Sequence, residues 1–382
     1  MEKQEVRDCL DRGMFDEALR VVPLKDIPQF RIIGSKYNIL PDIYRILEKE
    51  NIEAYSFFDV FSGSAVVGRF FKKMFSVISN DNLYFSYILQ RALIVINKCP
   101  SFSNLNFDNI PKDPKERVYR ILHYLNNLKG VEGFIYRHYT PASKDADGVE
   151  RKYFTTENGM KIDAIRIQIQ EWFENGYISE DEYFYLLASL LLAVQKIANT
   201  SGTYGAFNKF WDARSYKPLT LRYIEIIPSK FNHVAYNEDI FDLLEKVTCD
   251  IAYIDPPYNS RQYITNYHLL ETIAKYDNPK IKGKTGIREY GDQERSVFCS
   301  KKGVQDAFFK LVKGLKAKYI VISYNSEGLL SKNQIIQILD EGGLRDIRFY
   351  EIPYRRFKSN NNSRKNIVGE YLFIGVKENG EL

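Results

Sequence analysis

The sequence predicts an α/β fold whose mostly parallel sheet is interrupted by a mostly helical segment. A strand, a glycine turn, a helix and a second strand follow one another over 54–81, which is the pattern of a βαβ unit. Helical periodicity dominates the middle of the chain, and strand-like runs return at 233–258. With 382 residues the chain is long enough for two hydrophobic cores. We therefore expect residues 1–82 and 232–382 to form one domain, split by an insertion over 83–231.

Each expected element rests on the period of its apolar residues and on the turn residues at its ends. In the first part of the chain we expect helices over 1–30 and 39–47, a strand over 54–61, a helix ending at Phe71, a strand over 75–81 and a helix over 83–96. In the middle we expect helices over 115–128, 162–173 and 180–198, together with a polar segment over 136–159 that has turn chemistry. The last part predicts strands over 233–239, 250–258 and 317–325, and a terminal β-hairpin from 345–352 and 368–376.

The composition is that of an ordinary globular protein except for its aromatic residues. Hydrophobic residues make up 45% of the chain and charged residues 27%. The 28 Tyr and 25 Phe indicate flat, stackable surfaces beyond the needs of a core, and a Phe-rich core is the alternative. The net charge of +5 permits a polyanionic partner without requiring one.

Four cysteines lie far apart and form no C-x-x-C pair; they are Cys9, Cys99, Cys249 and Cys299. This usage suits a reducing compartment and predicts neither a disulfide framework nor a metal site. The N-terminal stretch MEKQEVRDCLDRG lacks the apolar region of a signal peptide. The longest apolar run, 183–198, is interrupted by Gln195 and Lys196 and is too short to span a membrane. A cytoplasmic protein without a membrane partner is expected.

The sharpest local pattern is IAYIDPPYNSRQY at 251–263. An apolar strand runs directly into Asp255, which therefore lies at the strand's carboxyl end, where open α/β sheets bind ligands. Pro256 and Pro257 make the turn stiff, because each fixes its own φ and holds the residue before it extended. The turn can aim the Asp255 carboxylate, a backbone carbonyl and the ring of Tyr258 at one point.

The exocyclic amine of adenine needs such a set of groups. Its lone pair is delocalised into the ring, so N6 is a poor nucleophile until two acceptors hold both of its hydrogens. Asp255 and the Pro256 carbonyl can accept these hydrogens while Tyr258 stacks on the purine. The alternative is structural, since Asp and Pro are frequent residues of strand-end turns.

Three further positions indicate a nucleotide-like ligand. Gly63, in FFDVFSGSAVVG, lets the backbone approach a ligand at the first strand-to-helix turn, although tight packing explains such glycines about as often. Asp81 ends the next strand, where an acid can accept from both hydroxyls of a ribose. Asp239 ends the strand before the Asp-Pro-Pro-Tyr strand and could accept from an adenine amine of a cofactor. For both acids the alternative is a helix N-cap. No G-x-x-x-x-G-K-[ST] run is present, so nucleotide hydrolysis is not supported.

Together these motifs resemble the D12 class of DNA adenine methyltransferases, the Dam-like group, which includes modification enzymes of restriction systems. The similarity runs from about residue 30 to the end. IIGSKYNIL (32–40) resembles the family's N-terminal cofactor motif, DVFSGSAVVG its glycine motif, SND its ribose-binding acid, YNED its adenine-binding acid and DPPY its catalytic motif, all in the family's order. One departure is Ala65, where the family usually has a second glycine.

The resemblance implies a Rossmann-like methyltransferase core with a terminal β-hairpin and a mostly helical recognition insertion, and S-adenosylmethionine as the cofactor. The implied catalytic residues are Asp255, Pro256, Pro257 and Tyr258. The implied cofactor-binding residues are Gly34, Ser35, Lys36, Asp59, Phe61, Gly63, Asp81 (ribose) and Asp239 (adenine). The target adenine of double-stranded DNA would flip out of the helix and be methylated on N6 by direct in-line transfer. A cognate restriction endonuclease is an expected partner.

Cationic segments at three places predict contacts to DNA phosphates. The first is 136–159, whose candidates are Arg137, Lys144, Arg151 and Lys152. The second, 280–303, has seven Lys or Arg against three acids. The third, 354–366, has no acid, and its candidates are Arg355, Arg356 and Lys358. Solvated surface charge is the alternative for any one of these segments.

Two rival functions are weighed against this one. The first is the same chemistry on RNA or on a protein side-chain amide. The corresponding motif generally begins with Asn in the protein-amide enzymes and often does so in the RNA enzymes. Asp255 and the insertion therefore favour DNA. The second is a non-catalytic nucleic-acid-binding module on a methyltransferase fold. The intact Asp255 and Tyr258 argue against it.

Overall fold

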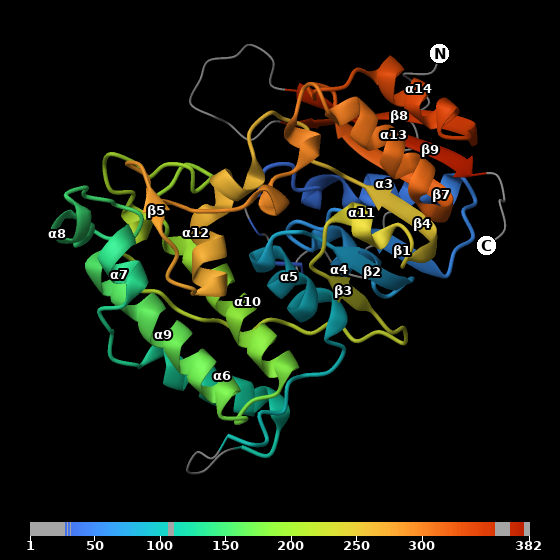
Figure 1. The fold of residues 1–382 in the computed structure, drawn as a ribbon. Helices are drawn as coiled ribbons and strands as arrows, with labels where there is room; N and C mark the ends of the chain where they lie inside the picture. Colours follow the sequence, from blue (N-terminus) through green and yellow to red (C-terminus); the bar gives the residue numbers. More distant parts are fainter. Residues whose placement is uncertain (1–26, 29, 31, 106–110, 356–366, 378–382) are drawn as a thin grey trace.

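The computed structural model describes residues 27–28, 30, 32–105, 111–355 and 367–377. It has a lobe built on the sheet and a lobe built mainly of helices, which lie side by side in Figure 1. The helix expected over 1–30 falls almost entirely outside the described residues. The side chains of 354–355 and 367–368 are likewise outside the description.

A seven-stranded sheet forms the centre of the first lobe, in the order β3-β2-β1-β4-β7-β9-β8. Its strands are β1 (Ser56–Asp59), β2 (Ser76–Asn80), β3 (Val234–Tyr236), β4 (Thr248–Ile254), β7 (Lys316–Asn325), β8 (Leu344–Arg355) and β9 (Ile367–Lys377). The first five strands in the spatial order pair in parallel, whereas β9 is antiparallel to both β7 and β8. The mostly parallel sheet and the terminal hairpin are therefore confirmed.

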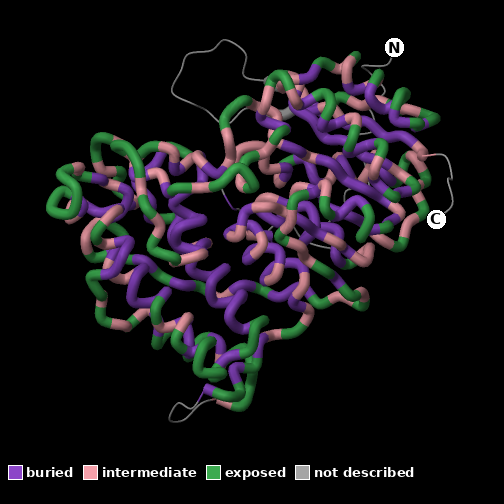
Figure 2. Tube along the Cα trace, viewed as in Figure 1, coloured by how far each residue is buried: buried purple, intermediate pink, exposed green. Residues whose placement is uncertain are grey.

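Both faces of the sheet are covered, which explains the nearly continuous apolar runs of its central strands. Side chains of consecutive strand residues point to opposite faces. Phe57 and Ile251 accordingly belong to one buried cluster, whereas their neighbours Phe58 and Ala252 belong to the other. Figure 2 shows the central strands as buried along most of their length. The helices of this lobe are α3 (Leu40–Lys49), α4 (Val66–Phe71), α11 (Ile240–Leu243), α13 (Val304–Gly314) and α14 (Lys332–Glu341).

The helical lobe contains the long helices that the periodicity predicts, and two short ones that it does not. Its helices are α6 (Pro114–Asn126), α7 (Phe134–Tyr139), α8 (Ser143–Asp147), α9 (Thr156–Glu174) and α10 (Glu180–Ile197). The segment 136–159, for which the sequence predicts turns, holds most of α7 and all of α8. The α7 N-terminus is satisfied by Asp163 of α9, which accepts hydrogen bonds from the backbone N–H of Ile135 (2.9 Å) and Tyr136 (2.8 Å). A cap from another helix leaves no local signal in the sequence.

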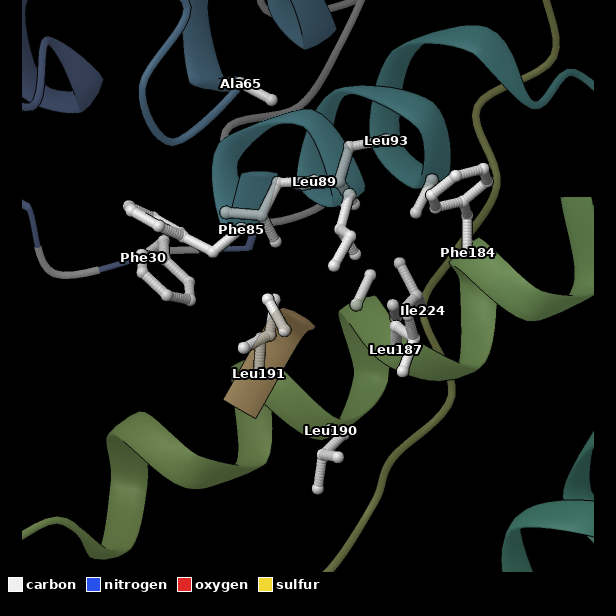
Figure 3. Packing of buried hydrophobic residues seen from close by; sticks show 14 of the residues in the cluster. Phe30, Ala65, Phe85, Leu89, Leu93, Phe184, Leu187, Leu190, Leu191 and Ile224 are labelled. Carbon is white, nitrogen blue, oxygen red and sulfur yellow. The ribbon is translucent and has the colours of Figure 1, made fainter. Parts of the chain in front are cut away.

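One hydrophobic core joins the two lobes. Helix α5 (Tyr84–Gln90) continues into a π-helical turn (Arg91–Val95), and both pack against α10. Figure 3 shows Leu89 and Leu93 of this helix facing Leu187 and Leu191 of α10. All four belong to the same buried cluster as Phe57 of the sheet. The two lobes thus share one of the two buried clusters, while the other lies within the sheet lobe.

Helix α12 (Tyr263–Lys275) and the small hairpin β5–β6 (Ile281–Lys282, Ile287–Arg288) lie with the helical lobe, although they follow the Asp-Pro-Pro-Tyr motif in the chain (Figure 1). Arg166 of α9 donates to the carbonyls of Ile273 and Ala274, both at 3.2 Å, near the end of α12. Tyr139 donates to the carbonyl of Gly286 at 2.8 Å. In space, therefore, the helical lobe includes a segment that the predicted division assigns to 232–382.

Five short helical turns complete the described structure: Tyr37–Ile39, Ala213–Tyr216, Asp292–Glu294, Val297–Cys299 and the π-helical turn given above. None of the helices in the described ranges is long and apolar enough to cross a membrane. The three cysteines in those ranges, Cys99, Cys249 and Cys299, are free thiols.

Candidate active site

A cavity of about 500 Å³ opens at the carboxyl ends of the parallel strands. Its walls come from segments at the ends of four of these strands: 61–64 after β1, 80–82 at the end of β2, 238–241 after β3 and 255–258 after β4. Open α/β sheets bind ligands at this edge, because the loops that follow parallel strands converge there. The motif residues thus meet in one place.

Asp81 joins the glycine loop to the start of α5. One of its carboxylate oxygens accepts the N–H of Gly63 and the other accepts the N–H of Leu83, each at 2.9 Å. Burial raises the pKa of Asp81 to about 6, against the lowering effect of these hydrogen bonds. Each carboxylate oxygen has a second lone pair, so Asp81 can still accept from a ligand in the cavity.

The glycine loop adopts left-handed backbone conformations at two positions. Gly63 has φ +52°, and Ala65 has φ 61° and ψ 14° directly before α4. An L-residue in this region is strained by about 1–2 kcal/mol, which glycine avoids. The conformation gives a physical reason for a glycine at the position of Ala65, and the fully buried methyl group of Ala65 is accommodated here.

Asp59 supports the glycine loop from behind and does not line the cavity. It is 1% exposed, accepts hydrogen bonds from the Ser62 hydroxyl (2.9 Å) and the Gly68 N–H (3.2 Å), and is thereby held under the loop. Burial raises the pKa of Asp59 to about 7. Asp59 thus lies in the layer beneath the residues that line the cavity, and its place at the border of the cofactor stays a prediction.

Asp239 and three aromatic rings form the far end of the cavity. Asp239 caps α11 by accepting the N–H of Phe241 at 2.9 Å, so the helix-cap alternative is realised, while Asp239 also lines the cavity. The ring of Phe298 is stacked with that of Phe241, at 6.1 Å and an interplanar angle of 9°, and meets Phe61 edge-on at 5.0 Å. Phe298 is not among the predicted site residues, since it lies beyond α12 and the β5–β6 hairpin in a segment with no recognisable pattern.

The N-terminal motif passes directly against the Asp-Pro-Pro-Tyr turn. Gly34 has φ +82°, and a Cβ added there would lie 3.0 Å from Cε1 of Tyr258. Glycine is therefore required both for the backbone conformation and for the close approach to the tyrosine ring. Ser35 follows Gly34 in the cavity wall. On the other side of the contact, the backbone carbonyl of Tyr258 accepts a hydrogen bond from the Leu329 N–H at 3.1 Å.

Lys36 places a buried positive charge beside Asp255. Its ammonium group lies 2.8 Å from Oδ1 of Asp255, 3.2 Å from Oε1 of Glu370 and 2.8 Å from the carbonyl oxygen of Gly34. Burial alone would lower the pKa of Lys36, but the two carboxylates raise it well above its ordinary value. Burial also raises the pKa of Asp255 to about 7; Lys36 lowers this pKa, and Glu370 raises it. Glu370 is not among the predicted site residues.

The Asp255 side chain is 16% exposed and lines the cavity together with Pro256, Pro257 and Tyr258. Its Oδ1 is held by Lys36, and among the described residues no partner is found for Oδ2. The turn therefore presents one anchored carboxylate with a free acceptor oxygen, next to an aromatic ring.

The candidates for DNA contact do not line this cavity, and their side chains differ in exposure. Arg137 and Lys144 are exposed on α7 and α8, and the Lys152 side chain is 28% exposed beside Glu150. Arg151 is 2% exposed: it pairs with Asp147 at 2.8 Å and donates to carbonyls of the β5–β6 hairpin. The guanidinium of Arg151 is thus engaged inside the protein, and its contact to DNA stays a prediction. Arg356 and Lys358 lie outside the described residues, as does the Arg355 side chain.

Comparison with known proteins identifies the family. The model of the D12 class N6 adenine-specific DNA methyltransferases matches residues 33–338. The chain is 46% identical over 354 residues to the type II methyltransferase M.FokI of Planomicrobium okeanokoites, an alignment that covers 91% of this chain and 53% of the relative. It is 42% identical over 352 residues to the type II methyltransferase M.NlaIII of Neisseria lactamica, covering 90% and 98% respectively.

The modification methylase StsI of Streptococcus sanguinis is 38% identical over 350 residues, which are 90% of this chain and 51% of the relative. The chain thus spans about half the length of M.FokI and StsI and nearly all of M.NlaIII. The matched range of this chain, 33–338, includes the glycine loop, the cavity acids and the Asp-Pro-Pro-Tyr turn described above. This chain belongs to the D12 class of N6 adenine-specific DNA methyltransferases.

Proposed function

We propose that the protein transfers a methyl group from S-adenosylmethionine to N6 of adenine in double-stranded DNA. The observation that carries the proposal is the free oxygen of Asp255 beside Tyr258, in the wall of a cavity that also contains Asp81 and Asp239. A turn that could hold an amine and acids that could bind a nucleoside thus line the same cavity. The modification methylases to which the chain is similar support a role in protecting cytoplasmic host DNA alongside a cognate restriction endonuclease.

The cavity's chemistry fits the cofactor. Its volume of about 500 Å³ lies in the range of small-molecule sites. The aromatic end at Phe61, Phe241 and Phe298 suits a purine, with Asp239 near enough in the wall to accept from its amine. Asp81 would hold the ribose hydroxyls. When bound, S-adenosylmethionine supplies the electrophilic methyl group.

The methionine end of the cofactor would lie by the N-terminal motif and the glycine loop. Gly34, Ser35 and Lys36 border the catalytic turn, and Gly63 faces the same space. Lys36 is the cation in this part of the wall, and its ammonium is already shared by two carboxylates. We therefore assign Lys36 to ordering the catalytic turn, where it borders the methionine end of the cofactor without binding its carboxylate.

The protein's own part in the reaction is to hold the target amine. The free Oδ2 of Asp255 would accept one hydrogen of N6 and the Pro256 carbonyl the other, which turns the nitrogen lone pair away from the ring. Tyr258 would stack on the base. Because N6 cannot be reached inside the duplex, the adenine has to flip into this pocket. The cationic segments and the helical lobe over 83–231, joined in space by α12 and the hairpin, would bind the surrounding DNA.

The proposed activity is tested by methyl transfer to defined nucleic acids. Purified protein is incubated with methyl-labelled S-adenosylmethionine and duplex DNA that contains all short sequence contexts, or with RNA of the same sequences. We expect label in the duplex, recovered as N6-methyladenine after digestion to nucleosides and confined to one short sequence. Label in RNA alone, or in cytosine, would show that the proposed substrate is wrong.

A second expectation concerns the cationic segment 354–366, which we propose contacts the DNA backbone. Replacing Arg355, Arg356 and Lys358 with alanine should lower affinity for cognate and random duplexes together, since phosphate contacts carry no sequence information. The slope of log K against log salt should flatten by up to about 0.9 for each phosphate that these side chains neutralise. Binding titrations at several salt concentrations measure both effects. Undiminished affinity with methylation at new sequences would instead assign base reading to this segment.

A further inference from the structure

A second buried carboxylate stands behind the catalytic turn. Glu370 lies on β9, the middle strand of the C-terminal part of the sheet, and is 1% exposed. Its Oε1 is 3.2 Å from the ammonium of Lys36 and accepts a hydrogen bond from the Ser323 hydroxyl of β7 at 2.7 Å. Ser323 is itself fully buried. Glu370 is not part of the cavity wall, and its contact with the site residues is the one to Lys36.

The charges of this cluster do not balance, and the imbalance points to a function. Lys36 and Asp255 alone would already form a neutral pair at 2.8 Å. Glu370 adds a negative charge in a buried position, which is unfavourable unless hydrogen bonds and a cation compensate it. The three N–H groups of Lys36 are all engaged, by Asp255, Glu370 and the Gly34 carbonyl. Glu370 thus fixes the ammonium in place and at the same time offsets its charge.

We propose that Glu370 is a positioning residue for methyl transfer: it holds Lys36 against Oδ1 of Asp255 and keeps Oδ2 basic enough to receive the proton that N6 releases. The inference rests on the proposed function and deepens it. Lys36 without Glu370 would draw charge away from Asp255 and weaken it as a hydrogen-bond acceptor. Glu370 without Lys36 would only repel Asp255. Both are needed to orient the carboxylate and to keep it basic.

The proton balance of the reaction shows why this matters. As the N6 lone pair forms a bond to the methyl carbon, the carbon–sulfur bond breaks and its electron pair goes to sulfur, which becomes a neutral thioether. N6 then carries one positive charge and one proton too many. That proton goes to Oδ2 of Asp255 and leaves to solvent when the product departs. The charge of the cluster therefore bears directly on the proton-accepting step.

Other ionisable groups also face Asp255, and their effects are distinct from that of Glu370. Tyr253 of β4, Tyr263 of α12 and Asp59 of β1 all interact with it electrostatically. Asp59 and Glu370 are the two acids that act on Asp255 in this way. Asp59 is held under the glycine loop by Ser62 and Gly68, whereas Glu370 contacts Lys36. The negative charge of Glu370 raises the pKa of Asp255, after burial and against the lowering effect of Lys36.

The test is the pH dependence of single-turnover methyl transfer in Glu370→Gln. Asp255 must be ionised to accept from N6, so the rate falls below its pKa. Because Glu370 raises that pKa, removing its charge should move the acidic limb to lower pH, by about 1 unit if the proton affinity falls tenfold. The rate on the plateau should also fall, by roughly tenfold, since the base is weaker. Affinity for S-adenosylmethionine should stay within about twofold of the wild type.

Glu351→Gln is the matched control, because it removes the same charge from the neighbouring strand β8 at an exposed position. We expect this variant to keep the plateau rate of the wild type and the acidic limb of its pH profile. Glu370→Asp keeps the charge and shortens the side chain by one methylene. Its acidic limb should therefore stay at the wild-type pH, while its rate on the plateau should fall. It also tests the proposal should Glu370→Gln fail to fold, since a wild-type rate in Glu370→Asp would contradict positioning.

Each result separates this inference from the proposed function. An active wild type together with an unshifted limb in Glu370→Gln overturns the role of Glu370 and leaves the methyltransferase assignment intact. A large loss of cofactor affinity at unchanged rate would make Glu370 a binding residue, which also overturns the proposal. A wild type that transfers no methyl group to any nucleic acid overturns both.

Discussion

Replacing Asp255 with alanine is expected to lower the rate of methyl transfer by about two to three orders of magnitude, by analogy with deleting one oxyanion-hole donor. The variant lacks the acceptor that holds one hydrogen of N6 and receives its proton. Cofactor affinity should remain close to that of the wild type, because Lys36 keeps its contacts to Glu370 and to the Gly34 carbonyl. Single-turnover rates at saturating cofactor and DNA measure the chemical step directly.

Asp340→Ala provides the control for this experiment, since Asp340 is exposed on α14 and is not part of the cavity wall. We expect its rate to equal that of the wild type. Equilibrium binding of S-adenosylmethionine to Asp255→Ala separates lost chemistry from lost affinity. A turnover near the wild-type value in that variant would remove Asp255 from the catalytic role, even if the Lys36 contact proves important for stability.

The sequence predicted the residues that lie at the ends of strands, because strand and turn patterns are local. Asp81, Asp239 and Asp255 each follow an apolar run, and parallel strands bring their carboxyl ends to one edge of the sheet. The family resemblance added Gly34 and Lys36, which precede the first strand. All five line the cavity.

Glu370 could not be found in this way, because its position depends on the pairing of distant strands. It sits opposite Asn325 of β7 in the antiparallel register, two strands away from Asp255. In the sequence it is one acid in VGEYLFIGV, a run typical of a terminal strand. Only the insertion of β9 between β7 and β8 places its side chain behind the catalytic turn. Local sequence patterns cannot predict which side chains the strand order brings to the site.

The cationic segment 136–159 shows that local sequence also cannot predict which charged side chains are exposed. Arg151 and Lys152 are adjacent in the chain, yet the first is buried and the second is partly exposed. The difference arises because Arg151 meets the β5–β6 hairpin, which lies far along the sequence and accepts its guanidinium hydrogens through backbone carbonyls. A high proportion of Lys and Arg predicts a basic surface but cannot tell which cations remain available to phosphates.

Replacing Asp81 with alanine is the second change from which we expect a large effect, on cofactor binding. A carboxylate that accepts from two ribose hydroxyls contributes about 1.5–3 kcal/mol, which corresponds to roughly a tenfold to 150-fold rise in Kd. DNA affinity should not change. Calorimetric titration of the variant with S-adenosylmethionine measures this effect.

Asp81 also accepts the N–H groups of Gly63 and Leu83, so the alanine variant could lose affinity merely because the glycine loop shifts. A cofactor analogue that lacks one ribose hydroxyl distinguishes the two causes. If Asp81 binds the ribose, the analogue should bind the wild type more weakly than S-adenosylmethionine does, while Asp81→Ala should bind both equally. The losses of binding free energy from Asp81→Ala and from removal of the hydroxyl are then not additive, as expected in a double-mutant cycle for groups in direct contact. Independent, additive losses would instead assign Asp81 to holding the loop, with the ribose bound by other groups.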